Sequence, residues 1–174
     1  GLAIQVFGQS LALSTGKIGT AADWYRQAVH ADPRATDYRI AFVINTLLPM
    51  GLLKDARIEA ERATRIDPKS ERAWRLLGGV LHKLGNAQES IDAYDKQIEI
   101  APTPDAYLDR ATIALDTADY ATARNLCESI LGTPRRPDAL HALAMVEYRE
   151  GNHERAIEIY DQAIEAGCHD PSLA

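Results

Sequence analysis

The sequence predicts an all-α solenoid, in which pairs of helices joined by tight turns follow one another along the whole chain. Residues 71–102 contain two runs with apolar residues at helical spacing, separated by Gly85-Asn86. Successive turns are 35, 34, 33 and 33 residues apart when they are placed at Gly16, Gly51, Gly85, Ala118 and Gly151. A fixed period of this length is typical of repeat proteins. We therefore expect a single solenoid domain over residues 1–174.

The stretch 71–102 shows how one unit is built. Its first run places four residues on one helical face: Trp74, Leu77, Gly78 and Leu81. Its second run also has one packing side, formed by Ser90, Ala93, Tyr94, Gln97 and Ile98. Pro102 follows, and proline cannot continue a helix. The unit is therefore a helix, a tight turn, a second helix and a stop.

This unit resembles the tetratricopeptide repeat, whose pattern of about 34 residues runs W-x-x-L-G-x-x-Y, A-x-x-x-F, P. Leu81 stands where the motif prefers Tyr, and Ser90 stands where it prefers Ala. The resemblance implies a right-handed superhelix of helix-turn-helix units. It covers nearly the whole chain as five repeats, at about residues 2–36, 37–70, 71–103, 104–136 and 137–170.

Two positions of each repeat have a packing role. Five residues after the turn stands a small residue, which lets the two helices of a repeat approach closely: Ala21, Ala56, Ser90, Ala123 and Ala156. Four residues later stands a residue expected to wedge between successive repeats: Tyr25, Ala60, Tyr94, Cys127 and Tyr160. Because one unit cannot bury its apolar face alone, neighbours must stack. Removing Trp74 should therefore cost about 3–5 kcal/mol, as for a buried tryptophan replaced by alanine.

Taken in order, the repeats differ in regularity. The first helix of repeat one, at residues 2–14, is almost uncharged, and the second helix ends at Asp32-Pro33. In repeat two, Pro49 lies near the end of the first helix and should kink or shorten its last turn. Repeat four lacks a large aromatic residue at the wedge position and ends irregularly at residues 132–137, so its packing should be the least regular. Repeat five regains the pattern and ends at Gly167.

Composition narrows the function classes. The 174 residues carry a net charge of -6, which argues against a general nucleic-acid binder because such proteins need a basic face. No apolar run reaches the roughly 18 residues of a membrane span, so no direct membrane insertion is expected. The first residue is Gly rather than Met, which is compatible with a removed targeting signal and leaves the cytoplasm and the periplasm both open.

The sequence gives little support for catalysis. Ser14-Thr15-Gly16-Lys17 matches a Ser-x-x-Lys pattern but falls on a repeat turn. The five histidines form no pair at metal-ligand spacing, and the adjacent residues Cys168, His169 and Asp170 are poorly suited to converge on one ion. Cys127 is expected to be a small buried residue. We expect neither an enzyme within these residues nor a cofactor or a metal.

The resemblance implies a concave groove, lined mainly by the first helix of each repeat, that binds a peptide or protein segment. Its expected lining includes Tyr38, Phe42, Asn45, Arg72, Arg75, His82, Lys83, Asp109, Thr112, His141 and Met145. Tyr38 and Phe42 would hold apolar anchors, and Arg72 and Arg75 would hold an acidic group. The opposing interpretation is that these residues are simply exposed. Asn45 fits one position of the carboxylate clamp found in chaperone-binding members, but Ala41, Leu76 and the acidic residues 105 and 109 do not.

The sequence therefore predicts a protein-interaction scaffold, with a weak likeness to bacterial proteins of pilus assembly, secretion or envelope biogenesis. Two alternatives remain: the regulatory or substrate-docking part of a larger enzyme, and a scaffold that assembles with itself. Both alternatives follow from the ends of the array, where a polar terminal cap is expected but the helix at residues 2–14 is apolar. The chain is expected to be either a slice of a longer array or a protein whose ends pair with another copy.

Overall fold

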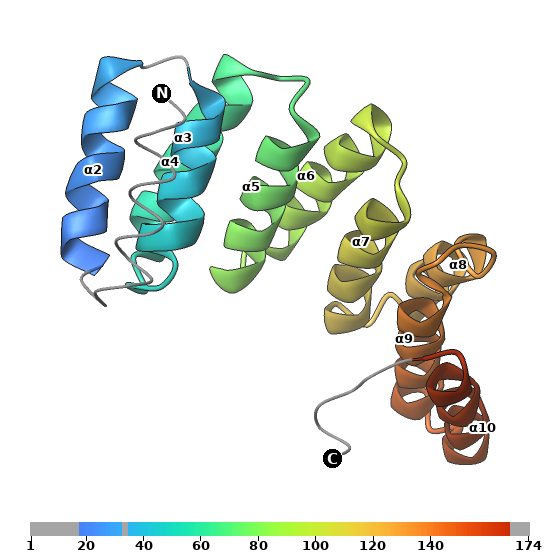
Figure 1. Ribbon diagram of the computed structural model, residues 1–174. Helices are drawn as coiled ribbons and strands as arrows, with labels where there is room; N and C mark the ends of the chain where they lie inside the picture. The colour runs from blue at the N-terminus through green and yellow to red at the C-terminus, as the bar shows by residue number, and fades with distance from the viewer. Residues whose placement is uncertain (1–17, 33–34, 168–174) are drawn as a thin grey trace. The chain divides into compact units, whose positions relative to one another are not determined.

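The computed structural model describes residues 18–32 and 35–167, and every regular element in these two stretches is helical (Figure 1). The all-α prediction and the tandem helix pairs are confirmed for this part of the chain. Repeat one contributes α2 (Ile18–Ala31), and its expected first helix at residues 2–14 lies outside the described residues. Repeat two contains α3 (Thr36–Phe42), the π-helix η1 (Val43–Leu47) and α4 (Leu53–Ile66).

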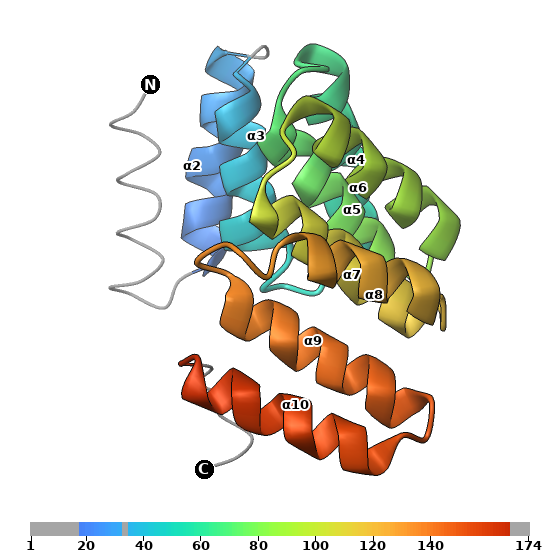
Figure 2. The ribbon, with the colours of Figure 1, turned by 90° about the vertical axis from the view of Figure 1, so that its right-hand side faces the viewer.

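The remaining three repeats are complete helix pairs. They are formed by α5 (Glu71–Lys83) with α6 (Ala87–Ile100), α7 (Pro104–Asp116) with α8 (Tyr120–Ser129), and α9 (Arg136–Arg149) with α10 (His153–Glu165). Figure 2 shows α9 and α10 lying side by side in repeat five.

The turns between paired helices need a left-handed backbone. Gly85 has φ of +78°, which glycine adopts at little cost because it has no Cβ. Ala118 stands at the equivalent turn of repeat four and also has a left-handed φ, of 58°. The prediction that residue 118 is a turn despite being alanine is confirmed.

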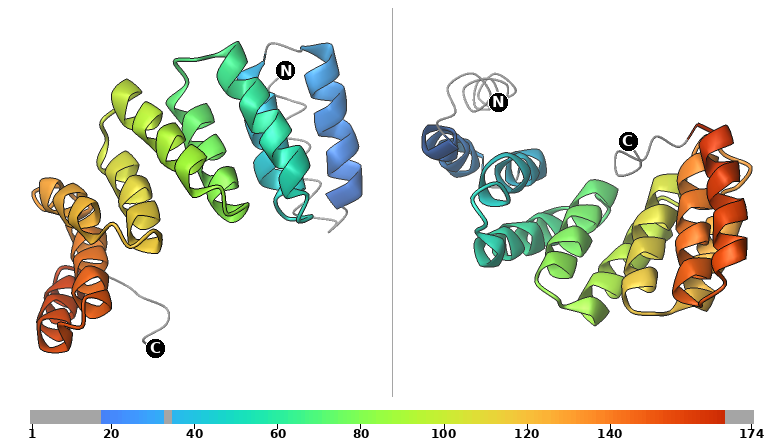
Figure 3. Two further views of the ribbon diagram at one scale, coloured as in Figure 1. Left: turned by 180° about the vertical axis from the view of Figure 1, so that it is seen from behind. Right: turned by 90° about the horizontal axis from the view of Figure 1, so that it is seen from below.

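The chain divides into two compact units, residues 1–96 and residues 97–174. In the first unit, α3 packs against both α2 and α4, as Figure 3 shows. Its core joins Tyr25 of α2 to a set from the following helices: Phe42, Val43, Leu47, Ala56 and Val80. A neighbouring cluster joins α4, α5 and α6 through Ala60, Leu77, Leu81 and Ala93.

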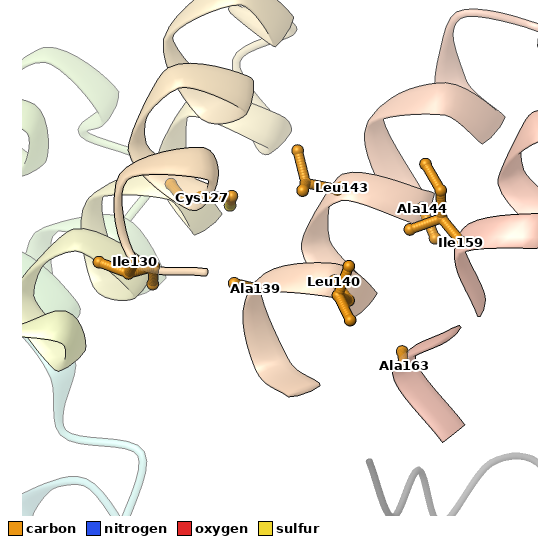
Figure 4. Close-up of a cluster of buried hydrophobic side chains, with 9 residues drawn as sticks. Cys127, Ile130, Ala139, Leu140, Leu143, Ala144, Ile159 and Ala163 are labelled. Carbon is orange, nitrogen blue, oxygen red and sulfur yellow. The ribbon is translucent and has the colours of Figure 1, made fainter. Parts of the chain in front are cut away.

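The core of the second unit lies between α7, α8, α9 and α10 (Figure 4). It contains Cys127 and Ile130 from the end of α8 and several small or branched residues from the next two helices: Ala139, Leu140, Leu143, Ala144, Ile159 and Ala163. All of these side chains are at most 7% exposed, so burial of apolar surface is the main force that holds these helices together.

Repeat three shows why the pattern needs a glycine. The ring of Tyr94 packs on Gly78, and a Cβ added at Gly78 would lie 2.8 Å from Cε1 of that ring. Ser90, at the small position, is fully buried and donates a hydrogen bond to the Gly78 carbonyl oxygen at 2.9 Å. The small residues Ala56, Ala123 and Ala156 are equally buried, as expected for close packing of the helices in repeats two, four and five.

The wedge position has two kinds of contact. Tyr25 of repeat one contacts Phe42 of repeat two, with ring centroids 6.2 Å apart, as expected for a residue between repeats. Tyr94 instead packs on Gly78 of its own repeat, because the glycine leaves room for the ring there. The wedge position therefore joins the helices within a repeat as well as successive repeats.

The expectation of a buried Trp74 is wrong. Its side chain is only partly buried against the cluster of Leu77 and Leu81, and its indole N–H donates to the Pro68 carbonyl oxygen at 2.9 Å. An indole at this place can keep its polar edge close to solvent. The loss on Trp74→Ala should therefore be smaller than the value for a fully buried tryptophan.

Two irregularities appear where the sequence places them. Ahead of Pro49, the first helix of repeat two widens into η1, in which Leu48 N–H donates to the Val43 carbonyl oxygen five residues back. Proline has no N–H to continue the normal ladder, so the backbone changes its hydrogen bonding before it. In repeat four, α8 has only 10 residues, against 13 to 14 in α4, α6 and α10.

Candidate functional site

The first helices of neighbouring repeats pack side by side within each unit. In the first unit, α3 lies beside α5, and in the second unit α7 lies beside α9. We call these two faces the α3–α5 surface and the α7–α9 surface. Except for Asn45, which belongs to η1, the residues expected from the sequence to bind a ligand belong to these four helices, although Phe42 of α3 is buried.

The α3–α5 surface is rich in cationic groups. Arg72 and Arg75 are both exposed on α5, and Lys83 is exposed at the end of that helix. Arg72 Nη1 lies 2.9 Å from Asp37 Oδ1 of α3, an ion pair between two side chains that are each more than 60% exposed. Such a pair contributes little to stability, so Arg72 can exchange Asp37 for another carboxylate at small cost.

Tyr38 and Asn45 both come from the first helix of repeat two, which comprises α3 and η1. Tyr38 is half-buried on α3. Asn45 is also half-buried, and its Nδ2 donates to the Tyr25 hydroxyl at 3.2 Å and to the Ala41 carbonyl oxygen at 2.9 Å. Burial raises the pKa of the Tyr25 phenol, and the Asn45 hydrogen bond opposes that shift. Asn45 is therefore fixed in place by the fold.

The expectation that Phe42 offers an apolar anchor in the groove is wrong. Phe42 is 8% exposed and belongs to the core around Tyr25. What remains of its surface lines a cavity of about 310 Å³ among the second helices, together with Arg26, Val29, His30 and Glu59. The helical period would place Phe42 on the same face as Tyr38, four residues earlier, but Ala41, Phe42 and Val43 are all buried, so neighbouring helices cover the helix on most sides here.

Behind the α3–α5 surface lies a buried ion-pair network. Arg39 of α3 and Arg62 of α4 both contact Glu59, each at 2.5 Å. The side chains of Arg39 and Glu59 are 9% and 13% exposed. Removing one partner from such a network leaves a charge in a dry environment, so the network fixes how α3 and α4 pack.

The α7–α9 surface is more acidic. Asp109 is half-buried and accepts a hydrogen bond from Gln97 Nε2 at 3.4 Å, whereas Thr112 is exposed and donates to the Leu108 carbonyl oxygen. Asp105 pairs with Arg135 at 2.6 Å. The pairing with Asp105, and a second one with Asp138, raises the pKa of Arg135.

His141 and Met145 meet a residue that the sequence did not assign to the surface. The hydroxyl of Tyr160, on α10, lies 2.9 Å from the Met145 sulfur, and its ring centroid is 5.5 Å from that of His141. Tyr160 had been assigned only a packing role. The hydroxyl of Tyr160 is the sequence feature that could have indicated a place on this surface, because a half-buried phenol needs a polar partner and a phenylalanine does not.

His82 is the last of the residues that the sequence predicts for ligand binding. It is half-buried near the end of α5, one position before Lys83. The structure thus places Tyr38, Arg72, Arg75, His82 and Lys83 on one unit, and Asp109, Thr112, His141 and Met145 on the other.

A second polar cluster lies at the turn between α9 and α10. Arg124 of α8 pairs with Glu147 and, at 2.6 Å, with Glu150, while Asn152 donates to Glu147 at 2.9 Å. The hydrogen bond from Arg124 is the main cause that lowers the pKa of the Glu147 carboxyl. A cavity of about 550 Å³ beside this cluster is lined by Glu147, Gly151, Asn152, His153, Glu154 and Arg155.

Cysteine chemistry and metal binding are two of the catalytic possibilities that the sequence raises. Burial raises the pKa of the Cys127 thiol to about 11, so the reactive thiolate is scarce at neutral pH. Between residues 18 and 167, apart from 33–34, no cluster of three His, Cys, Asp or Glu side chains could hold a metal ion. The patterns at residues 14–17 and 168–170 lie outside the described residues. None of the described helices combines the length and apolar character needed to cross a bilayer.

Known proteins give three points of comparison. Small glutamine-rich tetratricopeptide repeat-containing protein 2 of Mycosarcoma maydis is 30% identical over 92 residues, which is 53% of this chain and 26% of that protein. The solved structure of YrrB, described as a TPR protein with an unusual peptide-binding site, has a TM-score of 0.71 at 19% identity over 94% of this chain and 84% of that one. PilF of Pseudomonas aeruginosa has a TM-score of 0.78 at 21% identity over 97% of this chain and 77% of that one.

The two structures share the fold with this chain, and the curated relatives are longer proteins. The chain spans only 13% to 39% of the length of the four curated relatives that it matches. A family model described as the tetratricopeptide repeat matches residues 45–107 and 106–171, which is more than half of the chain. Together with the helix pairs, their turns and the packing of Tyr94 on Gly78, this match shows that the chain belongs to the tetratricopeptide repeat family.

Proposed function

We propose that this chain is a protein-interaction scaffold that binds an extended peptide or protein segment along the first helices of its repeats. The observation that carries the proposal is the α3–α5 surface, where Arg72, Arg75 and Lys83 are exposed on one helix beside the half-buried Tyr38. Guanidinium groups bind carboxylates with two parallel hydrogen bonds, which gives orientation as well as affinity.

The ligand class follows from the charges of that surface. An extended segment with an apolar or aromatic residue would contact Tyr38, and an acidic residue following it would replace Asp37 as the partner of Arg72. The exposed ion pair between Arg72 and Asp37 favours this exchange, because neither side chain loses a buried partner. The solved structure of YrrB, with its described peptide-binding site, gives a precedent for peptide binding on this fold.

The proposal can be tested by titrating a fluorescently labelled peptide against the chain and measuring anisotropy. The probe is a ten-residue extended peptide with one aromatic residue followed by two glutamates, and the matched peptide carries lysines in place of the glutamates. Arg72→Glu/Arg75→Glu should weaken binding of the acidic peptide by about 10- to 100-fold, the loss of one to two charged hydrogen bonds. Circular dichroism should show unchanged helicity.

The matched control is Lys54→Glu/Arg65→Glu, which makes the same change of charge at two exposed positions of α4. This control should bind the acidic peptide as tightly as the unmodified chain. Equal loss in both double variants would mean that only the overall charge matters. Retention of binding by Arg72→Glu/Arg75→Glu would remove the α3–α5 surface as the binding site.

A second function, as part of a longer protein, is supported by the greater length of the curated relatives. Since the chain spans 26% of the Mycosarcoma relative, these repeats can serve as the docking part of a longer protein, an enzyme included. The biological setting that we propose, bacterial pilus, secretion or envelope assembly, has the PilF fold likeness as its support. The protein can be purified from its source cells together with whatever is bound to it. Identifying the bound proteins by mass spectrometry would distinguish these settings.

A further inference from the structure

The last described helix, α10, carries a ridge of apolar side chains that face solvent. Ile157 and Ile164 are seven residues apart, so they lie on the same side of the helix two turns from each other. Their side chains are 61% and 53% exposed, among the largest exposures of any big apolar residue in the described part of the chain. Tyr160 lies between them and is half-buried.

The other repeats show what normally covers this ridge. Counting from the turn, Ile157, Tyr160 and Ile164 correspond to Arg57, Ala60 and Thr64 of α4. Ala60 is fully buried against Leu77 and Leu81 of α5, and Thr64 is 6% exposed. In α4 the middle position, Ala60, is therefore covered by the first helix of the following repeat, while Arg57 pairs with Glu89 of α6.

The second unit repeats the arrangement. The corresponding residues of α8 are Arg124, Cys127 and Leu131. Cys127 is fully buried, Leu131 packs against the cluster that includes Leu140, and Arg124 pairs with Glu147 of α9. The middle position is thus covered by a neighbouring helix in both cases, whereas the position equivalent to Ile157 carries an arginine that is held by ion pairs and is about one third exposed. Among α4, α8 and α10, the three positions are most apolar in α10.

The charges beside the ridge indicate what kind of helix would fit. Four exposed carboxylates run parallel to the ridge at helical spacing, at Glu154, Glu158, Asp161 and Glu165. The cation on α10, Arg155, pairs with Glu158 at 2.6 Å, and the ring of His153 lies beside Tyr148 at a centroid distance of 5.3 Å. Like charges three and four residues apart repel each other, so an incoming cationic helix would relieve this repulsion.

We propose that the Ile157–Ile164 ridge of α10 is a docking site for an amphipathic helix of a partner protein that carries Lys or Arg beside its apolar stripe. The apolar stripe covers the isoleucines as α5 covers α4, and the cations face the acidic row. A second copy of α10 fits less well, because two antiparallel copies would bring their acidic rows together. This site is separate from the first-helix surfaces, so it stands or falls independently of the proposed peptide binding.

The test uses the whole chain and two labelled 16-residue helical peptides, followed by fluorescence anisotropy. Both peptides have Leu and Ala at the covering positions, and the remaining positions are Lys in one peptide and Glu in the other. The Lys peptide should bind at least about tenfold more tightly at 50 mM NaCl, and the difference should shrink as salt screens the charges. Equal binding of the two peptides, or binding of neither, would overturn the proposal.

Variants then locate the site. Ile157→Ser/Ile164→Ser should weaken binding of the Lys peptide by at least about tenfold, since apolar anchors dominate such interfaces. The matched control is Ile58→Ser/Ile66→Ser, which changes two isoleucines of α4 that are 44% and 36% exposed, and it should leave the affinity unchanged. Asp161→Lys/Glu165→Lys should reverse the preference in favour of the Glu peptide.

Sedimentation velocity of the chain alone provides the remaining readout. A monomer in both the unmodified chain and Ile157→Ser/Ile164→Ser agrees with a helix supplied by another protein. A dimer that these serines abolish would mean that a second copy covers the ridge, and the proposal of a cationic partner would be wrong. Binding of the Lys peptide that survives the serine substitutions would likewise place its site elsewhere.

Discussion

At the scale of single residues, the conformation of Ala118 costs energy that a different side chain would avoid. It has φ of 58°, while the equivalent residues 51, 85 and 151 are glycines with φ of 70° to 87°. The left-handed region brings the Cβ of an L-residue close to the neighbouring backbone, which costs about 1–2 kcal/mol. The repeat keeps its turn here because the flanking helices fix the backbone.

Replacing Ala118 with glycine should therefore stabilise the protein. Ala118→Gly removes the steric cost but adds flexibility to the unfolded chain, so we expect a net gain of about 0.5–1 kcal/mol in the free energy of unfolding. Urea denaturation measures it. Ala121→Gly, at an exposed position inside α8, should instead lose about 0.5–1 kcal/mol. A loss in both variants would show that the backbone at 118 is not strained.

At the scale of elements, a single carboxylate links three helices. Glu147 of α9 is 7% exposed and accepts hydrogen bonds from Arg124 of α8 and from Asn152, which precedes α10. These bonds favour the ionised carboxylate, so its pKa in the folded chain lies below the ordinary value of 4.5. The packing of α8, α9 and the start of α10 therefore depends on pH.

The direction of this dependence follows from the pKa. Below about pH 4.5 the unfolded chain takes up a proton at Glu147 more readily than the folded chain, so the free energy of unfolding falls. Glu147→Gln should cost about 1–3 kcal/mol at pH 7, and its difference from the unmodified chain should shrink between pH 5 and about pH 3. Urea denaturation across this range measures both proteins.

Glu158→Gln is the control, because Glu158 makes an exposed pair with Arg155 and should show no comparable difference at any pH. A difference between Glu147→Gln and the unmodified chain that stays constant from pH 3 to pH 7 would contradict the assignment of the lowered pKa to Glu147.

At the scale of the whole molecule, a chain of stacked repeats should respond locally to damage. The helices α4 and α9 pack mainly on their neighbours in sequence, α4 on α3 and α5, and α9 on α8 and α10. Stability in such proteins is close to a sum of repeat terms and neighbour terms. A defect in one repeat should thus leave distant repeats almost as protected as before.

Hydrogen exchange of Gly78→Ala tests this expectation. The new Cβ would lie 2.8 Å from the Tyr94 ring, an overlap that should cost about 1–3 kcal/mol. Backbone amides of α4, α5 and α6 should exchange faster, while those of α9 and α10 should change little. Gly79→Ala is the matched control, since its Cβ would lie 3.6 Å from the Tyr94 hydroxyl, an ordinary contact. A uniform increase over all described helices would show that the chain opens as one cooperative unit.

The sequence identified some residues of the candidate site better than others. The exposure of Arg72 and Arg75 follows from the helical period, because positions on the side of a helix opposite its packing residues face solvent. Phe42 could not be placed this way. Its neighbours Ala41 and Val43 are buried too, so the helix there is apolar over most of its circumference. Which side Phe42 faces depends on how α2 and α4 pack against α3.

The sequence by itself determined the helix pairs, their turns and the small residues between them, because these depend on local backbone preferences and on a period that recurs along the chain. Even the turn at Ala118 was predictable from its distance to the glycine turns. Only the tertiary structure decided the partners of the polar side chains, such as Glu59 with Arg39 and Glu147 with Arg124. It also decided that Trp74 stays partly exposed and that Ile157 and Ile164 face solvent. Burial and pairing depend on residues distant in sequence that meet in space, and a repeat period does not specify them.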